Sequence, residues 1–189
     1  MSFNQSNRFP DPILSILVDY AHEPESMRRL LETATDWKKR GFFDVIIHVV
    51  SCCGKGRDDW KKPVLGSISY LHADFSVVTT EEYTVEDDPN EILNLLTEHY
   101  PPETMCQNIQ DLNPTHKYIR IFDRREALAT CPKIAKEIMQ LHPKKTKFLL
   151  VSTSMGSQQT MTLPEGEIDY DEREEWRKVF REVIGLSHI

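Results

Sequence analysis

Five short apolar runs recur along the chain, separated by longer stretches that mix polar and apolar residues. The runs are continuous rather than alternating and are rich in Val, Ile, Leu and Phe, which is typical of strands buried on both faces of a sheet. We therefore predict strands at residues 13–18, 45–50, 75–79, 118–121 and 148–152.

Apolar residues at helical spacing fill the stretches between these runs. Pro24 lies just inside the start of one predicted helix and Gly41 closes it, whereas Asp88 and Pro89 are suited to the N-cap and first position of another. Pro132 is expected to kink or divide the fourth helix. Helices are predicted at about residues 24–40, 63–71, from 88, from 123 and 171–184. Residues 100–117 are predicted as a long loop or short irregular helix, and the polar loop 163–169 is expected to join a short hairpin-like strand to the last helix.

This alternation of strands and helices predicts an α/β fold. We expect a three-layer, Rossmann-like domain, with a mostly parallel sheet of about six strands and helices on both faces. A length of 189 residues suits one such domain over residues 1–189, with residues 1–12 as an irregular lead-in.

Composition and charge narrow the classes of function. A net charge of -7 makes nucleic acid an unexpected partner, because phosphate binding needs clustered Lys and Arg. No apolar run approaches the roughly 20 residues that cross a bilayer, and no signal peptide is evident, so we expect no membrane partner and a cytoplasmic location. C-x-x-C spacing is absent, and reduced, buried thiols are expected at Cys52, Cys53, Cys106 and Cys131.

Ligands of such sheets gather at the carboxyl ends of the strands, where three loops carry polar residues. In LVDYAHEPES, Asp19 is suited to accept ribose hydroxyls, and His22, near a helix amino end, is suited to meet a phosphate. The same residues also fit a simpler interpretation, in which Asp19 caps the turn and His22 hydrogen-bonds the backbone. Taken alone, the turn favours the simpler interpretation.

The second loop, SCCGKGRDDWKKP, follows the second predicted strand. Gly54 and Gly56 permit tight turns with exposed amides, and Lys55, Arg57 and Lys61 add positive charge. This combination predicts an anion-binding loop, although a solvated surface turn fits about equally well. The loop does not have the Walker A pattern.

The third loop, TTEEYTVEDDPNEI, is acidic. Glu81 and Glu82 are suited to attract an amine, whereas Glu86, Asp87 and Asp88 are explained by their place near a helix amino end. The chain has neither a G-x-S-x-G elbow nor an H-E-x-x-H helix, so the usual support for a hydrolase or a metalloprotease is missing, and no metal ligands are predicted.

These loops, in this order, resemble the carboxyl-terminal domain of Mur ligases, especially those that add the third residue of the peptidoglycan stem peptide. The resemblance runs from about residue 17 to 184. Its anchors are VDYAHEP, GRDDWKKPVLG, TTEEYTVEDDP, FDRREAL, SMGSQQTM and DERE.

The resemblance implies an ADP-forming ligation, in which ATP phosphorylates a carboxylate and an amino acid's amine attacks the acyl phosphate. It implies nucleotide contacts at Asp19, Tyr20 and His22, and places Arg57 at the incoming amino acid's carboxylate. The implied amino-acid pocket comprises Arg57, Glu81, Glu82, Thr84, Ser154 and Gln158.

Two departures bear on the substrate. The diaminopimelate-adding members carry D-N-P-R where this chain has Glu81, Glu82, Tyr83 and Thr84, so the distal carboxylate of diaminopimelate loses its Arg partner. The family's G-K-G-x-E loop is replaced by SMGSQ at 154–158, without the Lys and the Glu. We therefore expect a basic or neutral amino acid, with lysine as first choice.

The family's P-loop, magnesium ligands and acyl-acceptor site belong to a central domain that these residues do not supply. ATP and Mg²⁺ binding would then need the amino-terminal and central domains, in cis or in trans, and this chain alone is predicted to be inactive. Two alternatives stay open: a degenerate binding or regulatory module that retains the fold, and an unrelated Rossmann-like nucleotide binder. The ligase hypothesis requires Asp19 and Arg57 to lie on one edge of a shared sheet.

Overall fold

The computed structural model describes residues 11–54, 56 and 58–184. Its main sheet is parallel throughout and has five strands in the order β1-β5-β2-β3-β4. The strands are β1 (Ile13–Val18), β2 (Val45–Val50), β3 (Phe75–Val78), β4 (Tyr118–Arg120) and β5 (Lys147–Ser152). The predicted α/β class and all five strand positions are confirmed.

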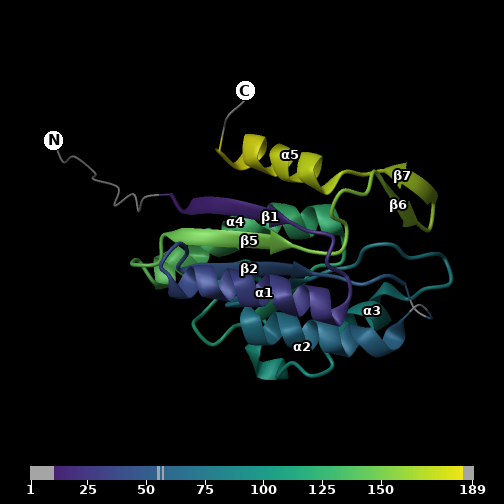
Figure 1. The fold of residues 1–189 in the computed structure, drawn as a ribbon, viewed down its shortest axis with the longest axis horizontal. Coiled ribbons are helices and arrows are strands. Elements are labelled where there is room, and N and C mark those ends of the chain that lie inside the picture. The colour runs from purple at the N-terminus through teal and green to yellow at the C-terminus, as the bar shows by residue number, and fades with distance from the viewer. Residues whose placement is uncertain (1–10, 55, 57, 185–189) are drawn as a thin grey trace.

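The order of the strands fixes which helix covers which face. The chain steps in one direction through β1, β2, β3 and β4 and then returns to insert β5 between β1 and β2. Right-handed crossovers therefore place the first three connecting helices on one face and the fourth on the other. The helices are α1 (Pro24–Lys39), α2 (Lys62–His72), α3 (Pro89–Leu96), α4 (Arg124–Leu141) and α5 (Glu172–Ile184), and Figure 1 shows α1 and α2 together on one side of the sheet.

Side chains that alternate along each strand divide the core into two layers. In β2, Ile46 and Val50 pack with α1, α2 and α3, whereas Val45, Ile47 and Val49 pack with α4 and α5. All five side chains are fully buried. The continuous apolar runs in the sequence are explained by this burial on both faces.

Short capping contacts set where the helices begin. The Asp88 carboxylate accepts a hydrogen bond from Asn90 N at 2.8 Å at the start of α3, and Asp123 accepts one from Glu126 N at 2.8 Å at the start of α4. The contact of Asp88 is the predicted N-cap, and Asp123 caps the helix that was predicted to begin at that residue. Pro132 lies inside α4, which continues past it and is not divided.

The remaining elements refine the loop predictions. Residues 100–117 hold two short 3-10 helices, Pro102–Thr104 and Ile109–Asp111, and a third, Asp59–Lys61, precedes α2. Residues 163–169 differ from the predicted loop, because β6 (Thr160–Leu163) and β7 (Gly166–Asp169) form an antiparallel hairpin apart from the main sheet. The main sheet thus has five strands instead of the expected six or so, and the two strands of the hairpin do not join it. In Figure 1 the hairpin lies beyond the carboxyl ends of the strands.

Two further expectations concern burial and membranes. All four cysteines are buried and none of them forms a disulfide, as predicted. Within residues 11–54, 56 and 58–184, no helix combines the length and the apolar character that a membrane span requires. The predicted lead-in over residues 1–12 lies almost wholly outside the described residues.

Candidate functional site

Four loops enclose a cavity at the carboxyl edge of the sheet, with a volume of about 200 Å³. The loops follow β1, β2, β3 and β5, and the last of these strands lies between β1 and β2, where the chain reverses its direction through the sheet. Such a reversal is where open α/β sheets bind ligands. The cavity is lined by Tyr20, His22, Glu23, Cys52, Cys53, Asp58, Lys61, Glu81, Glu82, Ser154 and Gln158.

The cavity brings two predicted sets of residues together. Tyr20 and His22 come from the predicted nucleotide set, whereas Glu81, Glu82, Ser154 and Gln158 come from the predicted amino-acid pocket. Asp19 is not among the lining residues, and Lys55 and Arg57 lie outside the described residues. The expected approach of Asp19 to Arg57 therefore stays a prediction.

The turn after β1 has the internal hydrogen bonds of the simpler interpretation. The Asp19 carboxylate accepts a hydrogen bond from Ala21 N at 2.8 Å, and His22 Nδ1 lies 2.8 Å from the carbonyl oxygen of Tyr20. Because a carbonyl only accepts, Nδ1 carries a proton and donates it to this oxygen. Tyr20 is 52% exposed, and its ring meets that of His22 edge-on at 4.8 Å.

The loop after β5 packs directly beneath this turn. Gly156 has a φ of +53°, and a Cβ atom there would lie 2.6 Å from Cβ of Tyr20. Only glycine fits such a close approach. The place of Tyr20 at the cavity rim therefore depends on the glycine of the SMGSQ segment.

Acidic side chains of this protein lie around the predicted anion-binding loop. Lys61 Nζ lies 2.8 Å from Glu23 Oε1 and 3.0 Å from Asp58 Oδ2. Burial by itself would lower the pKa of Lys61, but the hydrogen bonds to Glu23 and Asp58 raise it above the ordinary value. The ammonium charge is already compensated within the protein.

The backbone amides of Gly54 and Gly56 in this loop also have hydrogen-bond partners within the protein. Gly54 N donates to the carbonyl oxygen of Glu82 at 2.7 Å, and Gly56 N donates to the Asp59 carboxylate at 3.1 Å. These donors point at internal acceptors, so an external anion would have to displace Asp59 or use other groups. Anion binding by Gly54, Lys55, Gly56 and Lys61 stays a prediction.

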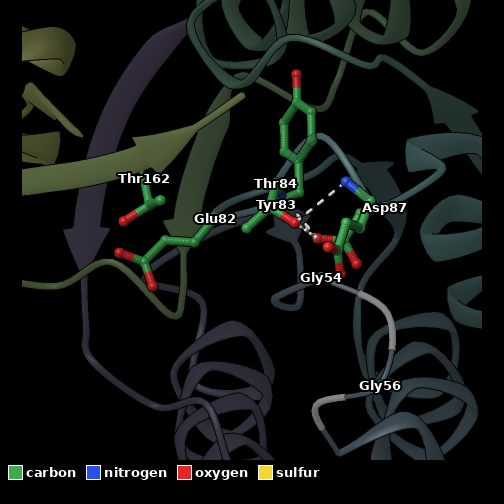
Figure 2. Close-up of a pocket in the computed structure, with 8 residues that line it drawn as sticks. Gly54, Gly56, Glu82, Tyr83, Thr84, Asp87 and Thr162 are labelled. Atoms are coloured by element: carbon green, nitrogen blue, oxygen red, sulfur yellow. Dashed lines mark hydrogen bonds between the residues drawn. The ribbon is translucent and has the colours of Figure 1, made fainter. Parts of the chain in front are cut away.

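A second cavity, of about 340 Å³, adjoins the loop after β3 and is acidic. It is lined by Gly54, Gly56, Glu82, Tyr83, Thr84, Glu86, Asp87 and Thr162, and Figure 2 shows the labelled side chains among them. Glu82 lines both cavities. The three carboxyl side chains suit a cationic group more than an anionic one.

Thr84 and Asp87 are hydrogen-bonded to each other in the lining of this second cavity. The Asp87 carboxylate accepts hydrogen bonds from Thr84 N at 2.7 Å and from Thr84 Oγ1 at 2.9 Å, drawn as dashed lines in Figure 2. A Cβ at Gly54 would lie 2.4 Å from Asp87 Oδ2. The missing side chain of Gly54 therefore lets the second and third loops come together.

Some lining residues were not predicted from the sequence. Thr162 comes from β6, and its carbonyl oxygen accepts a hydrogen bond from Tyr83 N at 3.1 Å, which joins the hairpin to the acidic loop. No local pattern indicates this contact. Glu23, Asp58 and the two adjacent cysteines were also missed as cavity residues.

A buried ion pair lies next to the carboxyl edge. Arg124 is 3% exposed and Glu172 is fully buried. Burial lowers the pKa of Arg124, and the negative charge of Glu172 more than offsets this, so the guanidinium stays charged. The FDRREAL and DERE anchors contain these two residues, but nothing in the sequence indicates that they meet.

Over the residues that the structure describes, no three His, Cys, Asp or Glu side chains converge in a way that would hold a metal ion.

Comparison with known proteins identifies the class. Residues 5–141 match the family described as Mur ligase, glutamate ligase domain, and the chain belongs to this family. Membership in this family rules out an unrelated Rossmann-like nucleotide binder, one of the two alternatives left open by the sequence.

Within this family, the chain is similar to UDP-N-acetylmuramoyl-L-alanyl-D-glutamate--2,6-diaminopimelate ligases. It is 30% identical to the enzyme of Thermosynechococcus vestitus over 92% of this chain and 29% of that enzyme. It is 24% identical to the enzyme of Clostridium botulinum over 89% of this chain and 29% of that one. The chain thus spans less than a third of the length of these relatives.

A solved structure supports the same fold. The structure of a UDP-N-acetylmuramoyl-L-alanyl-D-glutamate--2,6-diaminopimelate ligase superposes with a TM-score of 0.65 at 20% identity, covering 95% of this chain and 31% of that one.

Proposed function

We propose that this chain forms the carboxyl-terminal part of an ATP-dependent, ADP-forming acid–amino-acid ligase for peptidoglycan precursors, working in the cytoplasm. The observation that supports this most is the single cavity of about 200 Å³ shared by Tyr20, His22, Glu81, Glu82, Ser154 and Gln158. The residues proposed to bind the nucleotide and those proposed to bind the amino acid line the same cavity. The ligation requires such proximity, because the amine must reach the acyl phosphate that forms with ATP.

In this proposal the two ligands approach from different loops. The nucleotide contacts the exposed ring of Tyr20 and the ring of His22, and Asp19 holds their turn in place. The amino acid lies between Glu81 on one loop and Ser154 and Gln158 on another, and Arg57 binds its carboxylate. The amine is then directed toward an acyl phosphate bound by the rest of the enzyme.

The acidic second cavity supports a cationic substrate. Its carboxyl side chains Glu82, Glu86 and Asp87 attract an ammonium group and repel a second carboxylate, and Thr84 offers no positive charge. Lysine has a side-chain ammonium group and no second carboxylate, whereas diaminopimelate carries a second carboxylate. We therefore propose lysine as the amino acid.

ATP and Mg²⁺ would be held mainly by the amino-terminal and central domains of a Mur ligase, in the same polypeptide or a separate one. Phosphoryl transfer needs a metal ion and a phosphate-binding loop, and the described residues offer no metal-ligating cluster. The contribution of this chain is to bind and orient the two ligands. It should release no ADP by itself.

A chimera tests the proposal. The chain would be fused behind the amino-terminal and central domains of a diaminopimelate-adding ligase, and ADP formation measured with each amino acid in turn. We expect turnover with lysine, loss of lysine use in the Glu82→Arg variant, and none from the 189-residue chain alone. Robust ADP release by the isolated chain, or lysine use unchanged by Glu82→Arg, would contradict the proposal.

A second candidate function is a non-catalytic binding or regulatory module that retains this fold. The observations that favour it are the SMGSQ segment, which lacks the family's Lys and Glu, and the internal compensation of Lys61 by Glu23 and Asp58. A chimera inactive with every amino acid offered would favour the module.

A further inference from the structure

A directed chain of hydrogen bonds runs from the start of α4 to the cavity. Arg124 Nη1 donates to Ser51 Oγ at 2.7 Å, and Ser51 Oγ donates to Glu81 Oε2 at 2.8 Å. Ser51 is fully buried, whereas Glu81 lines the cavity. A guanidinium only donates and a carboxylate only accepts, so the hydroxyl between them can point in one direction alone. The relay therefore holds Glu81 in one orientation.

The same guanidinium also fixes the loop after β5. Arg124 Nη2 donates to the carbonyl oxygen of Thr153 at 2.8 Å. The next residue, Ser154, has a φ of +81°, and its Oγ donates to the carbonyl oxygen of Ser51 at 3.4 Å. Ser154 also lines the cavity. Two loops that supply predicted amino-acid contacts are thus tied to one side chain.

Glu172 anchors the guanidinium from the other side. Its Oε2 accepts from Arg124 Nε at 2.8 Å and its Oε1 from Arg124 Nη2 at 2.8 Å, and Tyr170 also donates a hydrogen bond to it. Both charged groups are buried and paired. Only a planar fork reaches Glu172, Thr153 and Ser51 together, so lysine cannot replace Arg124 here.

We propose that Arg124 is a positioning residue for the amino-acid pocket: through Ser51 it orients the Glu81 carboxylate, and through Thr153 it orients the Ser154 turn. This inference rests on the proposed function, because it takes Glu81 and Ser154 as amino-acid contacts. A carboxylate already held in one rotamer loses little conformational entropy when an ammonium group binds it.

Two variants and one matched control test the relay in the 189-residue chain. Ser51→Ala removes the hydroxyl, and Arg124→Lys keeps a positive charge beside Glu172 but removes the fork. Ser152→Ala is the control, because Ser152 is equally buried and accepts from Trp176 Nε1 at 3.0 Å without taking part in the relay. The measurements are three-bond couplings of the Glu81 side chain by NMR and titration with L-lysine.

We expect one Glu81 rotamer in the wild type and in Ser152→Ala, and averaging over rotamers in Ser51→Ala and Arg124→Lys. The dissociation constant of lysine should rise about tenfold in both relay variants and stay unchanged in the control. A single Glu81 rotamer and unchanged lysine affinity in Ser51→Ala would overturn the positioning role. If the wild type binds no lysine, the proposed function fails, and the couplings still decide whether the relay orients Glu81.

Discussion

The backbone carbonyl of Leu96 in α3 occupies the space where Gly66 of α2 would carry a side chain. A Cβ at Gly66 would lie 1.7 Å from that oxygen, and Tyr100 Oη donates to the Gly66 carbonyl oxygen at 2.8 Å. The two helices therefore cross at a distance that only glycine permits.

Gly66→Ala is expected to lower the free energy of unfolding by about 3 kcal/mol, because the helices must separate to admit the methyl group. Urea denaturation measures the effect. Ser67→Ala, one residue along the same helix, removes only a hydroxyl bonded to the Pro63 carbonyl and should cost less than about 1 kcal/mol. Equal stability of the two variants would contradict this description of the crossing.

His48 predicts a dependence of stability on pH. It is fully buried in β2, and its ring nitrogens lie 2.8 Å from Ser69 Oγ and 3.1 Å from Thr153 Oγ1. Burial, together with the positive charge of Arg124, lowers the pKa of His48 from 6.5 to about 3. Between these values the unfolded chain binds a proton that the folded chain does not, so stability falls as the pH falls below about 6.5.

Replacing His48 isolates its contribution. Between pH 6.5 and pH 5 the wild type should lose up to about 1.4 kcal/mol per pH unit through this group. His48→Gln should be less stable at pH 7 but show a shallower loss over the same interval. Parallel pH profiles for the two proteins would show that His48 is not the group responsible.

Removing the charge of only one partner of the Arg124–Glu172 ion pair should strongly destabilise the protein. Glu172→Gln leaves a buried guanidinium without its counter-charge, and we expect a loss of about 3–5 kcal/mol in the free energy of unfolding. The double variant Arg124→Met with Glu172→Leu should recover much of that loss, because no charge is then left unpaired. Arg177→Ala, which removes an exposed partner of Glu174, should have little measurable effect. If the effects of Arg124→Met and Glu172→Leu measured singly simply add up to that of the double variant, the two residues are not a coupled pair.

Gly156 tests the packing beneath the nucleotide side of the cavity. Gly156→Ala introduces a Cβ 2.6 Å from that of Tyr20 and strains a backbone with a φ of +53°, so the Tyr20 and His22 ring signals should shift in NMR spectra. Gly166→Ala is a suitable control, because its φ is +123° but no atom lies within 4 Å of the added Cβ. If both variants leave the Tyr20 ring undisturbed, Gly156 does not support it.

The fold was largely predictable because burial on both faces leaves a strong local signal. The runs that became β2 and β5 are apolar at nearly every position, and Asp88 and Asp123 mark helix starts by side-chain chemistry that acts within three residues. The hairpin was harder to see. Its strand Gly166–Asp169 is short and largely exposed, so it lacks the apolar pattern that would distinguish it from a loop.

The site was predictable only in part. The loops at strand ends follow from the sheet topology, and the cavity lined by Tyr20 and Glu81 confirms that these two loops meet. Contacts between residues far apart in the sequence leave no local pattern. Arg124 pairs with Glu172, 48 positions away, and Lys61 pairs with Glu23, 38 positions away. The sequence showed that Lys61 adds positive charge to its loop. It did not show that the carboxylates of Glu23 and Asp58 compensate this charge.

The most direct test asks where the two proposed ligands bind when the chain is fused behind the amino-terminal and central domains of a diaminopimelate-adding ligase. Amide spectra would be recorded with ATP and with L-lysine, added separately and then together. We expect ATP to shift Tyr20 and His22, and lysine to shift Glu81, Ser154 and Gln158, around one shared cavity. Shifts confined to the opposite edge of the sheet, in the cavity lined by Asp74 and His116, would contradict the proposed ligase site.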